Sequence, residues 1–391
     1  MGKQKKAIAE VLAHKHILVC GNNLNALSII RSLGEVGIRP IVIVLESNAI
    51  HLVEKSKYVG KVIHVHSFKE SFQILLSYKD AQCKPFVYTS DDNHQSLLDM
   101  KYEELKDYFY FFNAGEKGRI TYFMDKDKIC LAAQKCGFDI ANGEVLLRGQ
   151  MPQNLRYPVI TKTLNPCDYG WKRDVGIYYS ADELAKAYTE MVSQRLLVEE
   201  YIEKKNELSM QGFSIDGGKI VYLPFKRQYF RFTKTSYGSY CYYYTNKDEA
   251  LTEKITQLIR KIGFSGNFEI EFIEKPDGGL VFLEINFRHA LSNYASTIGG
   301  VNLPYEWAKA TLRHSLEGLV PTRDYFTALF ETKDYANFVK TGQISKLKWL
   351  KDFFNADSYY LWNRLDMRPV VAFYLGKAKR KLRHQSKEDE I

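Results

Sequence analysis

Short apolar runs separated by amphipathic segments fill the N-terminal part of the chain. Four of these runs predict buried strands, and the segments after the first and third runs predict helices that end near Leu33 and Tyr78. This alternation of strand and helix is typical of a doubly wound, Rossmann-like α/β unit. The predicted strands are His16–Cys20, Pro40–Leu45, Lys61–His66 and Pro85–Thr89.

Two polar segments follow predicted strands in this unit. The turn after the first strand has Asn23 and Ala26 where a dinucleotide-binding GxGxxG turn has its later glycines, so the pattern favours a structural role over nucleotide binding. The segment Ser90–Asp92 follows the fourth strand. Either it caps the next predicted helix, Asn93–Met100, or it contacts a ligand at the carboxyl end of the sheet.

The pattern changes after Phe112 and predicts a second unit of helices and antiparallel strands. Residues 228–244 are rich in Tyr and Phe, and helical segments with many aromatic side chains follow Leu303. The predicted helices of this unit are Thr121–Phe138 and Asp248–Ile262, and its predicted strands are Arg156–Thr163, Leu196–Ile202, Glu207–Ser214 and Ile220–Lys226.

The segment Gly266–His289 predicts a β-hairpin with one acidic face. A two-residue Asp-Gly loop, or a four-residue loop beginning at Pro276, sets Glu271 opposite Glu284 and Glu269 opposite Asn286. A three-residue loop with a bulge would shift the pairing by one residue and separate the carboxylates. The two strands predicted to form the hairpin are Phe268–Ile273 and Leu280–Ile285.

Facing carboxylates on this hairpin repel each other across the two strands. A divalent cation held by carboxylate and amide oxygens would compensate, and Mg²⁺ prefers such ligands. The alternative is a solvated acidic face, because exposed Glu is ordinary in antiparallel sheets.

Charge, cysteine content and hydropathy indicate where in the cell we expect the protein. The 391 residues carry a net charge of +9, concentrated in Lys377–Lys387, where a solvated helix end is favoured over a membrane or nucleic-acid contact. The six cysteines form no CxxC pair, which is typical of reduced core residues. No signal-peptide core and no membrane-spanning run is present, so we expect a soluble cytoplasmic protein that binds no nucleic acid.

Six short motifs occur in a fixed order between Ile17 and Leu312, and the hairpin motif EF…EIN-x-R is the most specific of them. In chain order they are DK at Asp125-Lys126, PVITK at Pro158–Lys162, VEEYI at Val198–Ile202, Glu207, EF at Glu271-Phe272 and EINFR at Glu284–Arg288. This set resembles the ATP-grasp superfamily. Within it, Lys226-Arg227-Gln228 and the TSDD of Thr89–Asp92 resemble the carboxylate–amine ligases close to D-aspartate ligase, and the chain is also similar to the large subunit of carbamoyl-phosphate synthase.

The resemblance implies an α/β fold class with three parts. A Rossmann-like pre-ATP-grasp domain (residues 1–120) precedes a two-lobed α+β ATP-grasp domain (121–312), whose lid subdomain covers about 125–198. A mainly helical C-terminal extension (313–391) follows.

The resemblance also implies a role for each motif residue. Lysines contact ATP phosphates, one strand binds adenine, one acid binds the ribose, three side chains bind Mg²⁺ or Mn²⁺, and an arginine steadies the transferring phosphate. In that order these are Lys126 and Lys162; Glu199, Glu200, Tyr201 and Ile202; Glu207; Glu271, Glu284 and Asn286; and Arg288.

The implied reaction is phosphorylation of a carboxylate by ATP, followed by attack of an amine on the acyl phosphate. The partners are then small-molecule carboxylate and amine substrates, with a homodimer expected by analogy. The residues suit this chemistry, because catalysis by positioning and charge neutralisation needs no Ser/His or Cys/His constellation. An amino acid, a cell-envelope precursor or an amino sugar of a surface polysaccharide would all be compatible as the amine.

One further segment supports the resemblance, and another departs from it. Lys226-Arg227-Gln228 is similar to a segment of these ligases, and we predict that Lys226 and Arg227 contact phosphate or the substrate carboxylate; exposed strand charges are the alternative. The loop Asn165–Lys172 has one glycine where relatives have a glycine- and serine-rich lid. An ATP-binding module without turnover therefore remains an alternative function, whereas a dehydrogenase is disfavoured by the missing N-terminal glycines.

Overall fold

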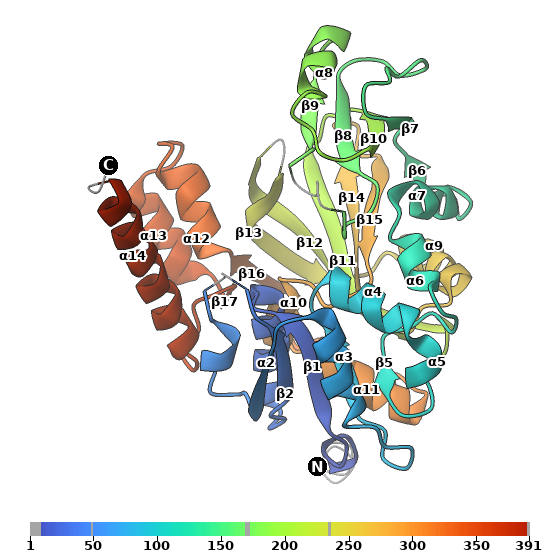
Figure 1. Cartoon of the computed structure of the whole chain (residues 1–391), viewed down its shortest axis with the longest axis vertical. Helices are drawn as coiled ribbons and strands as arrows, with labels where there is room; N and C mark the ends of the chain where they lie inside the picture. Colours follow the sequence, from blue (N-terminus) through green and yellow to red (C-terminus); the bar gives the residue numbers. More distant parts are fainter. Residues whose placement is uncertain (1–8, 48–49, 169–172, 234–235, 389–391) are drawn as a thin grey trace.

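The structure is a computed structural model that describes residues 9–47, 50–168, 173–233 and 236–388 (Figure 1). Its N-terminal part is a five-stranded parallel sheet in the order β3-β2-β1-β4-β5. This order confirms the predicted doubly wound unit. The strands are β1 His16–Gly21, β2 Ile41–Leu45, β3 Lys61–Val65, β4 Phe86–Thr89 and β5 Tyr110–Phe111.

Helices cover both faces of this sheet because successive strand residues point to opposite sides. Leu18, Cys20 and Val42 pack in one cluster with helix α2 (Leu24–Glu35). On the other face Ile17, Val19 and Ile43 pack with α3 (Phe68–Leu76) and α4 (Asp92–Met100). The short helix α5 (Tyr102–Leu105) leads to β5.

The next part is a small lobe that projects from the body, at the top of Figure 1. It is an antiparallel four-stranded sheet in the order β7-β10-β8-β9, and its core includes Val159, Leu184 and Val198. The elements are β7 Gly143–Leu147, β8 Val159–Thr163, β9 Gly176–Tyr178, β10 Arg195–Glu200 and α8 Ala181–Ala187.

An eight-stranded sheet forms the centre of the molecule, in the order β17-β16-β13-β12-β11-β14-β15-β6. The aromatic stretch predicted near residues 228–244 continues β12 and supplies β13 of this sheet. Helix α9 (Glu249–Ile262) leads into the hairpin. The strands are β6 Asp139–Ile140, β11 Asn206–Ile215, β12 Ile220–Thr233, β13 Ser236–Thr245, β14 Gly266–Glu274, β15 Leu280–Asn286, β16 Tyr325–Leu329 and β17 Ser358–Tyr359.

The hairpin register is the predicted one, but the loop is not. Glu271 pairs with Glu284 and Glu269 with Asn286. The turn nevertheless has three residues between Lys275 and Gly279, with Gly278 at φ +86°. A register shift directly after Glu271 compensates for this loop: a bulge between Phe282 and Glu284 restores the pairing of the carboxylates.

The predicted single helix Thr121–Phe138 is wrong. The chain forms two helices, α6 (Arg119–Phe123) and α7 (Lys126–Gln134), because Asp125 adopts an extended conformation between them. Asn165 donates a hydrogen bond to the Asp125 carboxylate (2.7 Å), and the Lys126 backbone N–H donates to the Leu164 carbonyl (3.0 Å). These contacts place Lys126 at the start of α7.

The C-terminal part is mostly helical, as predicted, but it is not a separate layer. Strand β16 extends the central sheet beside β13, and the helices α13 (Lys346–Asn355) and α14 (Arg368–Glu388) are both seen at the left of Figure 1. Arg31 of α2 forms a buried ion pair with Asp366 (3.1 Å). The C-terminal part is therefore bound to both the central sheet and the N-terminal unit. The remaining helices are α10 Asn293–Ile298, α11 Leu303–Arg313 and α12 Glu331–Asp334.

Among the described residues no helix is long and apolar enough to cross a membrane. All six cysteines lie in the described part and are free thiols; Cys20, Cys130 and Cys241 are buried, as predicted for core residues, whereas Cys167 is exposed.

Candidate active site

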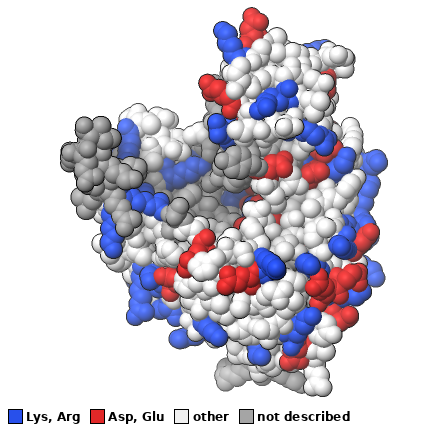
Figure 2. All heavy atoms as spheres, in the orientation of Figure 1, with Lys and Arg blue, Asp and Glu red and all other residues white. Residues whose placement is uncertain are grey.

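A cavity of about 500 Å³ lies where the hairpin, α7, β12 and the ends of the parallel strands meet. Figure 2 shows the molecular surface hollowed between the projecting lobe and the body, with acidic side chains near the hollow. Six predicted site residues line this cavity: Lys126, Arg227, Glu271, Glu284, Asn286 and Arg288.

The acidic face of the hairpin forms one wall of the cavity. Glu269, Glu271, Glu284 and Asn286 all contribute to it. Burial raises the pKa of Glu271 well above its usual value, and the negative charges of Glu269 and Glu284 raise it further, while Arg227 opposes the shift. The wall therefore concentrates more negative charge than its neighbouring cation neutralises.

Arg227 is a buried cation beside this wall, with 6% of its surface exposed. Its Nη2 lies 3.0 Å from a Glu269 carboxylate oxygen, and its Nη1 donates to the Ser292 hydroxyl. Gln211 also donates to Glu269 (2.9 Å). The Arg227 Nε–H, by contrast, has no hydrogen-bond acceptor among the residues that the structure describes.

Arg288 follows the hairpin and is oriented by the N-terminal unit. Its Nε and Nη2 donate to the two carboxylate oxygens of Asp92 at 2.9 and 3.0 Å, and Nη2 also donates to the Asn286 side-chain oxygen at 3.2 Å. Burial alone would lower the pKa of Arg288, but the Asp92 carboxylate raises it, so the guanidinium stays charged. The bidentate contact fixes the plane of the guanidinium.

The two predicted phosphate-binding lysines lie near each other in the fold. Lys162 of β8 pairs with Glu199 of β10 at 2.5 Å. Burial would lower the pKa of Lys162, but the charges of Glu199 and, more weakly, Glu284 raise it above its usual value. Burial raises the pKa of the Cys130 thiol to about 12; the charge of Glu199 raises it further, and the charges of Lys162 and Lys126 oppose the shift.

The predicted adenine-binding strand joins the small lobe to the central sheet. Glu199 points toward Lys162, whereas the Glu200 carboxylate accepts hydrogen bonds from Asn142 and the Arg156 backbone on the other face. The Tyr201 N–H donates to the Pro158 carbonyl (2.8 Å), and Ile202 lies in the connection without regular structure.

Glu207, the predicted ribose-binding acid, begins the central sheet just after this connection. Its side chain is largely buried and accepts a hydrogen bond from Lys204. The residue does not line the cavity described above, although its charge acts on Glu271.

The structure does not bring Lys226 to the cavity. Neighbouring strand residues point to opposite faces, and Arg227 occupies the cavity face of β12. Lys226 instead forms an ion pair with Asp248 (2.6 Å), the N-cap of α9. Its predicted contact with a substrate is thus replaced by a structural contact.

In the segment after the fourth strand, Asp91 and Asp92 have different roles. Asp91 is the N-cap of α4 and accepts a hydrogen bond from the His94 N–H (2.9 Å), which confirms the cap prediction. Its other oxygen accepts from the Gly21 N–H (2.9 Å). Asp92, the next residue, holds Arg288.

The cavity residues that sequence reasoning missed include Tyr229, Ser292 and Tyr360. Tyr229 stands two positions after Arg227 on β12, so strand alternation could have found it. Ser292 and Tyr360 lie in segments without a strong periodic pattern, and only the folded chain brings them here. Of the loop with the single glycine, residues 169–172 lie outside the described part of the chain.

Several solved structures share the fold of this chain. An L-amino acid ligase from Bacillus licheniformis superposes with a TM-score of 0.63 at 15% identity, covering 80% of this chain and 79% of that one. An N5-carboxyaminoimidazole ribonucleotide synthetase in complex with ADP gives 0.61 at 14% identity (83% and 85%). A biotin carboxylase–β,γ-ATP complex from Campylobacter jejuni gives 0.59 at 17% identity (80% and 74%).

The sequence agrees with this structural similarity. Residues 192–332 match the family described as "ATP-grasp in the biosynthetic pathway with Ter operon". No curated protein matched the sequence. The match over residues 192–332 and the shared fold of these solved structures agree with the resemblance that the motifs indicated.

Proposed function

We propose that this protein is an ATP- and Mg²⁺-dependent ligase that activates a carboxylate as an acyl phosphate and joins it to an amine. The observation that carries the proposal is the pairing of Glu271 with Glu284 in the wall of a cavity that also contains Lys126 and Arg288. Acids, a lysine and an arginine around one cavity suit the transfer of a phosphoryl group.

The donor set of the acidic wall fits Mg²⁺. Burial raises the pKa of Glu271 and the charges of Glu269 and Glu284 raise it further, so a divalent cation beside these carboxylates would favour the ionised form. Glu271, Glu284 and Asn286 offer hard oxygen ligands, whereas Glu269 is already paired with Arg227. Glu271, Glu284 and Asn286 would hold the Mg²⁺, whose charge would offset that of the ATP phosphates.

ATP is proposed to bind between the small lobe and the central sheet. Lys126 and Lys162 are the candidate phosphate contacts, and the Lys162–Glu199 pair would hold the lysine in place before the nucleotide arrives. Residues 199–202 are proposed to receive the adenine, and Glu207 the ribose hydroxyls.

Arg288 is proposed to steady the phosphoryl group in transfer. A substrate carboxylate oxygen attacks the γ-phosphorus, the bond from that phosphorus to ADP breaks, and an acyl phosphate forms. The amine nitrogen then attacks the acyl carbon, phosphate leaves, and the nitrogen loses its proton. Because Asp92 fixes the guanidinium in advance, little reorganisation is needed as charge moves between oxygens.

Arg227 is proposed to bind the carboxylate that is activated. It lines the cavity, it is buried, and its Nε–H has no acceptor in the described part of the chain. A substrate carboxylate would supply that acceptor, and Tyr229 and Tyr360 would flank it from the cavity wall. In this proposal, the part of the cavity around Arg227 selects the substrate, and the part around Lys126 binds the ATP phosphates.

The proposal is tested by incubating the protein with ATP, Mg²⁺ and pools of carboxylates and amines, with ADP and phosphate as readouts and mass spectrometry of the product. Release of ADP that depends on both pools is expected. Glu284→Gln should abolish it, and Glu253→Gln, the same change on the exposed surface of α9, should not. ATP binding without turnover in every pool would favour the alternative of an ATP-binding module. Turnover that persists in Glu284→Gln would overturn the assignment of the site.

A further inference from the structure

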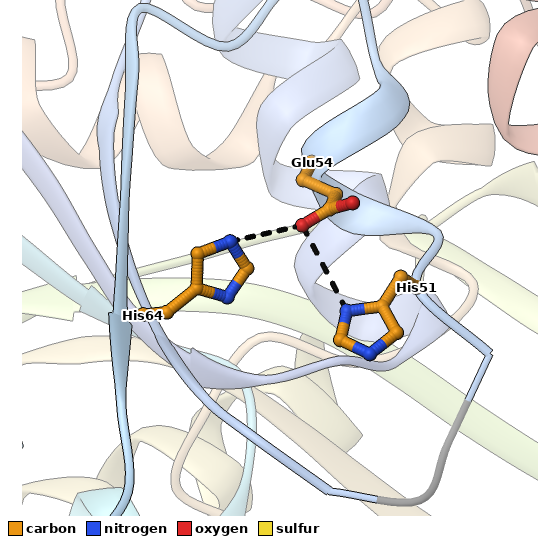
Figure 3. A group of neighbouring side chains, drawn as sticks. All are labelled: His51, Glu54 and His64. Atoms are coloured by element: carbon orange, nitrogen blue, oxygen red, sulfur yellow. Dashed lines mark ion pairs between the residues drawn. The ribbon is translucent and has the colours of Figure 1, made fainter.

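A cluster of histidine and glutamate side chains lies at the outer edge of the parallel sheet, away from the cavity. His51 and Glu54 come from the segment that follows β2, and His64 comes from the edge strand β3 (Figure 3). One potential ligand atom from each of the three residues lies within 4.8 Å of the others. We propose that this cluster is a binding site for a divalent transition-metal cation of the Zn²⁺ class.

The distances suit a small cation held by three protein ligands. Glu54 Oε2 lies 3.0 Å from His64 Nε2 and 3.8 Å from His51 Nδ1. Ligand atoms around tetrahedral Zn²⁺ are about 3.3 Å apart, given bonds of about 2.0–2.1 Å. Figure 3 shows both imidazoles directed at the same carboxylate oxygen. Small side-chain movements would therefore complete three ligands and leave a fourth position for water.

Groups around the cluster hold its members in orientations that favour a metal. The other oxygen of Glu54 is occupied by Lys55 (2.6 Å), which leaves Oε2 for the imidazoles. His64 Nδ1 lies 3.3 Å from the Glu46 carboxylate. A metal-binding histidine usually donates its second ring N–H to such a carboxylate, which fixes the tautomer and strengthens the ligand.

The backbone that carries two of the ligands is anchored. The N–H groups of Leu52 and Val53 donate to the Asn22 side-chain oxygen at 2.9 and 3.1 Å. Both Leu52 and Val53 are buried, so they fix the segment between His51 and Glu54. His51 and Glu54 lie on this segment, and His64 lies on β3. A metal ion bound by all three would therefore hold the segment against the edge of the sheet.

The chemistry of the ligands separates this site from the cavity. Imidazole nitrogens favour Zn²⁺, Ni²⁺ and Cu²⁺, whereas the all-oxygen set of the hairpin favours Mg²⁺. The two sites therefore select different cations, and binding at the sheet edge does not depend on the proposed ligase activity.

The test is calorimetric titration of ZnCl₂ into the full-length, untagged, metal-free protein in a buffer with excess Mg²⁺. We expect one equivalent to bind per chain. His51→Ala and His64→Ala should each weaken binding by about 100-fold or more, and Glu46→Gln, which removes only the supporting carboxylate, by about 10–100-fold. His314→Ala is the matched control, because His314 forms an exposed contact with Asp216 elsewhere on the surface.

Two results would overturn the proposal: no saturable Zn²⁺ binding by the wild-type protein, or wild-type affinity in both His51→Ala and His64→Ala. Equal unfolding midpoints of all variants in chelator would show that lost binding does not result from lost folding. Because these residues are at least partly exposed, we expect that equality.

Discussion

The facing carboxylates of the hairpin predict that Glu271→Gln stabilises the protein when Mg²⁺ is absent. Glu271 and Glu284 are directly opposite on paired strands, and Glu269 adds a third carboxylate on the same wall. Replacing Glu271 by Gln keeps the size of the side chain and removes its charge. The variant should therefore be more stable than the wild type in chelator, and it should lose the proposed ligase activity.

The magnitude follows from the separation of the two charges. Side chains directly opposite on antiparallel strands are about 5 Å apart. Two unit charges at that distance repel by about 3 kcal/mol at an effective dielectric constant of about 20, and ordinary cross-strand pairs contribute up to about 1 kcal/mol, which gives a range of about 1–3 kcal/mol. An unfolding entropy of about 0.8 kcal/mol/K for a chain of 391 residues converts this range to about 1–4 °C in Tm.

The effect should depend on pH with a definite sign. Because the folded-state pKa of Glu271 is raised above its ordinary value of 4.5, the folded state binds a proton more tightly than the unfolded state does. Wild-type stability therefore falls as pH rises from about 4.5 through the raised pKa. The Tm difference between Glu271→Gln and the wild type should be largest at pH 8 and should shrink toward pH 5.

Differential scanning fluorimetry, in chelator and in Mg²⁺ and at several pH values, measures the Tm difference between Glu271→Gln and the wild type. Glu284→Gln should have a similar effect, and the double variant should add little, because either change alone removes the repulsion between Glu271 and Glu284. Glu253→Gln is the control without a facing charge. A Glu271→Gln variant that is less stable than the wild type in chelator, or a Tm difference that does not change with pH, would refute the reasoning.

Three further predictions concern the ion pairs around the site. Lys162→Met removes a charge-assisted phosphate contact of about 1.5–3 kcal/mol, so ATP affinity measured by calorimetry should fall about 10–150-fold; unchanged affinity would contradict the assignment. Arg288→Lys keeps the charge but loses the two bonds to Asp92, so kcat should fall about 100-fold while the KM for ATP changes little. Asp366→Ala leaves Arg31 buried and unpaired, which should cost about 3–5 kcal/mol and about 4–6 °C in Tm, and replacing both residues by apolar ones should recover most of that loss.

Local patterns predicted the elements of the fold well. The parallel strands, the cap at Asp91 and the pairing of Glu271 with Glu284 all follow from periodicity within short segments. The break at Asp125 was not predictable in this way, because it depends on a contact with Asn165, which is distant in sequence. The hairpin loop was also missed, since its three-residue turn and the later bulge cancel each other in the register.

The candidate site was predictable only where its residues belong to motifs. Arg288 was found through its motif, but its partner Asp92 is 196 positions away, and no local rule joins the two. Lys226 and Arg227 are adjacent in sequence, and only the packing of β12 decides that Arg227 faces the cavity. Tyr360 reaches the wall from the C-terminal part because β16 and β17 extend the central sheet.

The ion pair between Asp92 and Arg288 makes the site depend on both the N-terminal unit and the hairpin, so the two parts should be inherited together. A chimera that joins this hairpin to the N-terminal unit of another protein would keep the acidic wall but lose the carboxylate that orients Arg288. Exchange of either unit alone would therefore be selected against, and the two positions should change together among relatives. This gives a sequence criterion for recognising chains with the same arrangement. Such a chain has an acid in the position of Asp92, directly after the helix N-cap that follows the fourth strand. It also has an arginine in the position of Arg288, two residues after the hairpin asparagine.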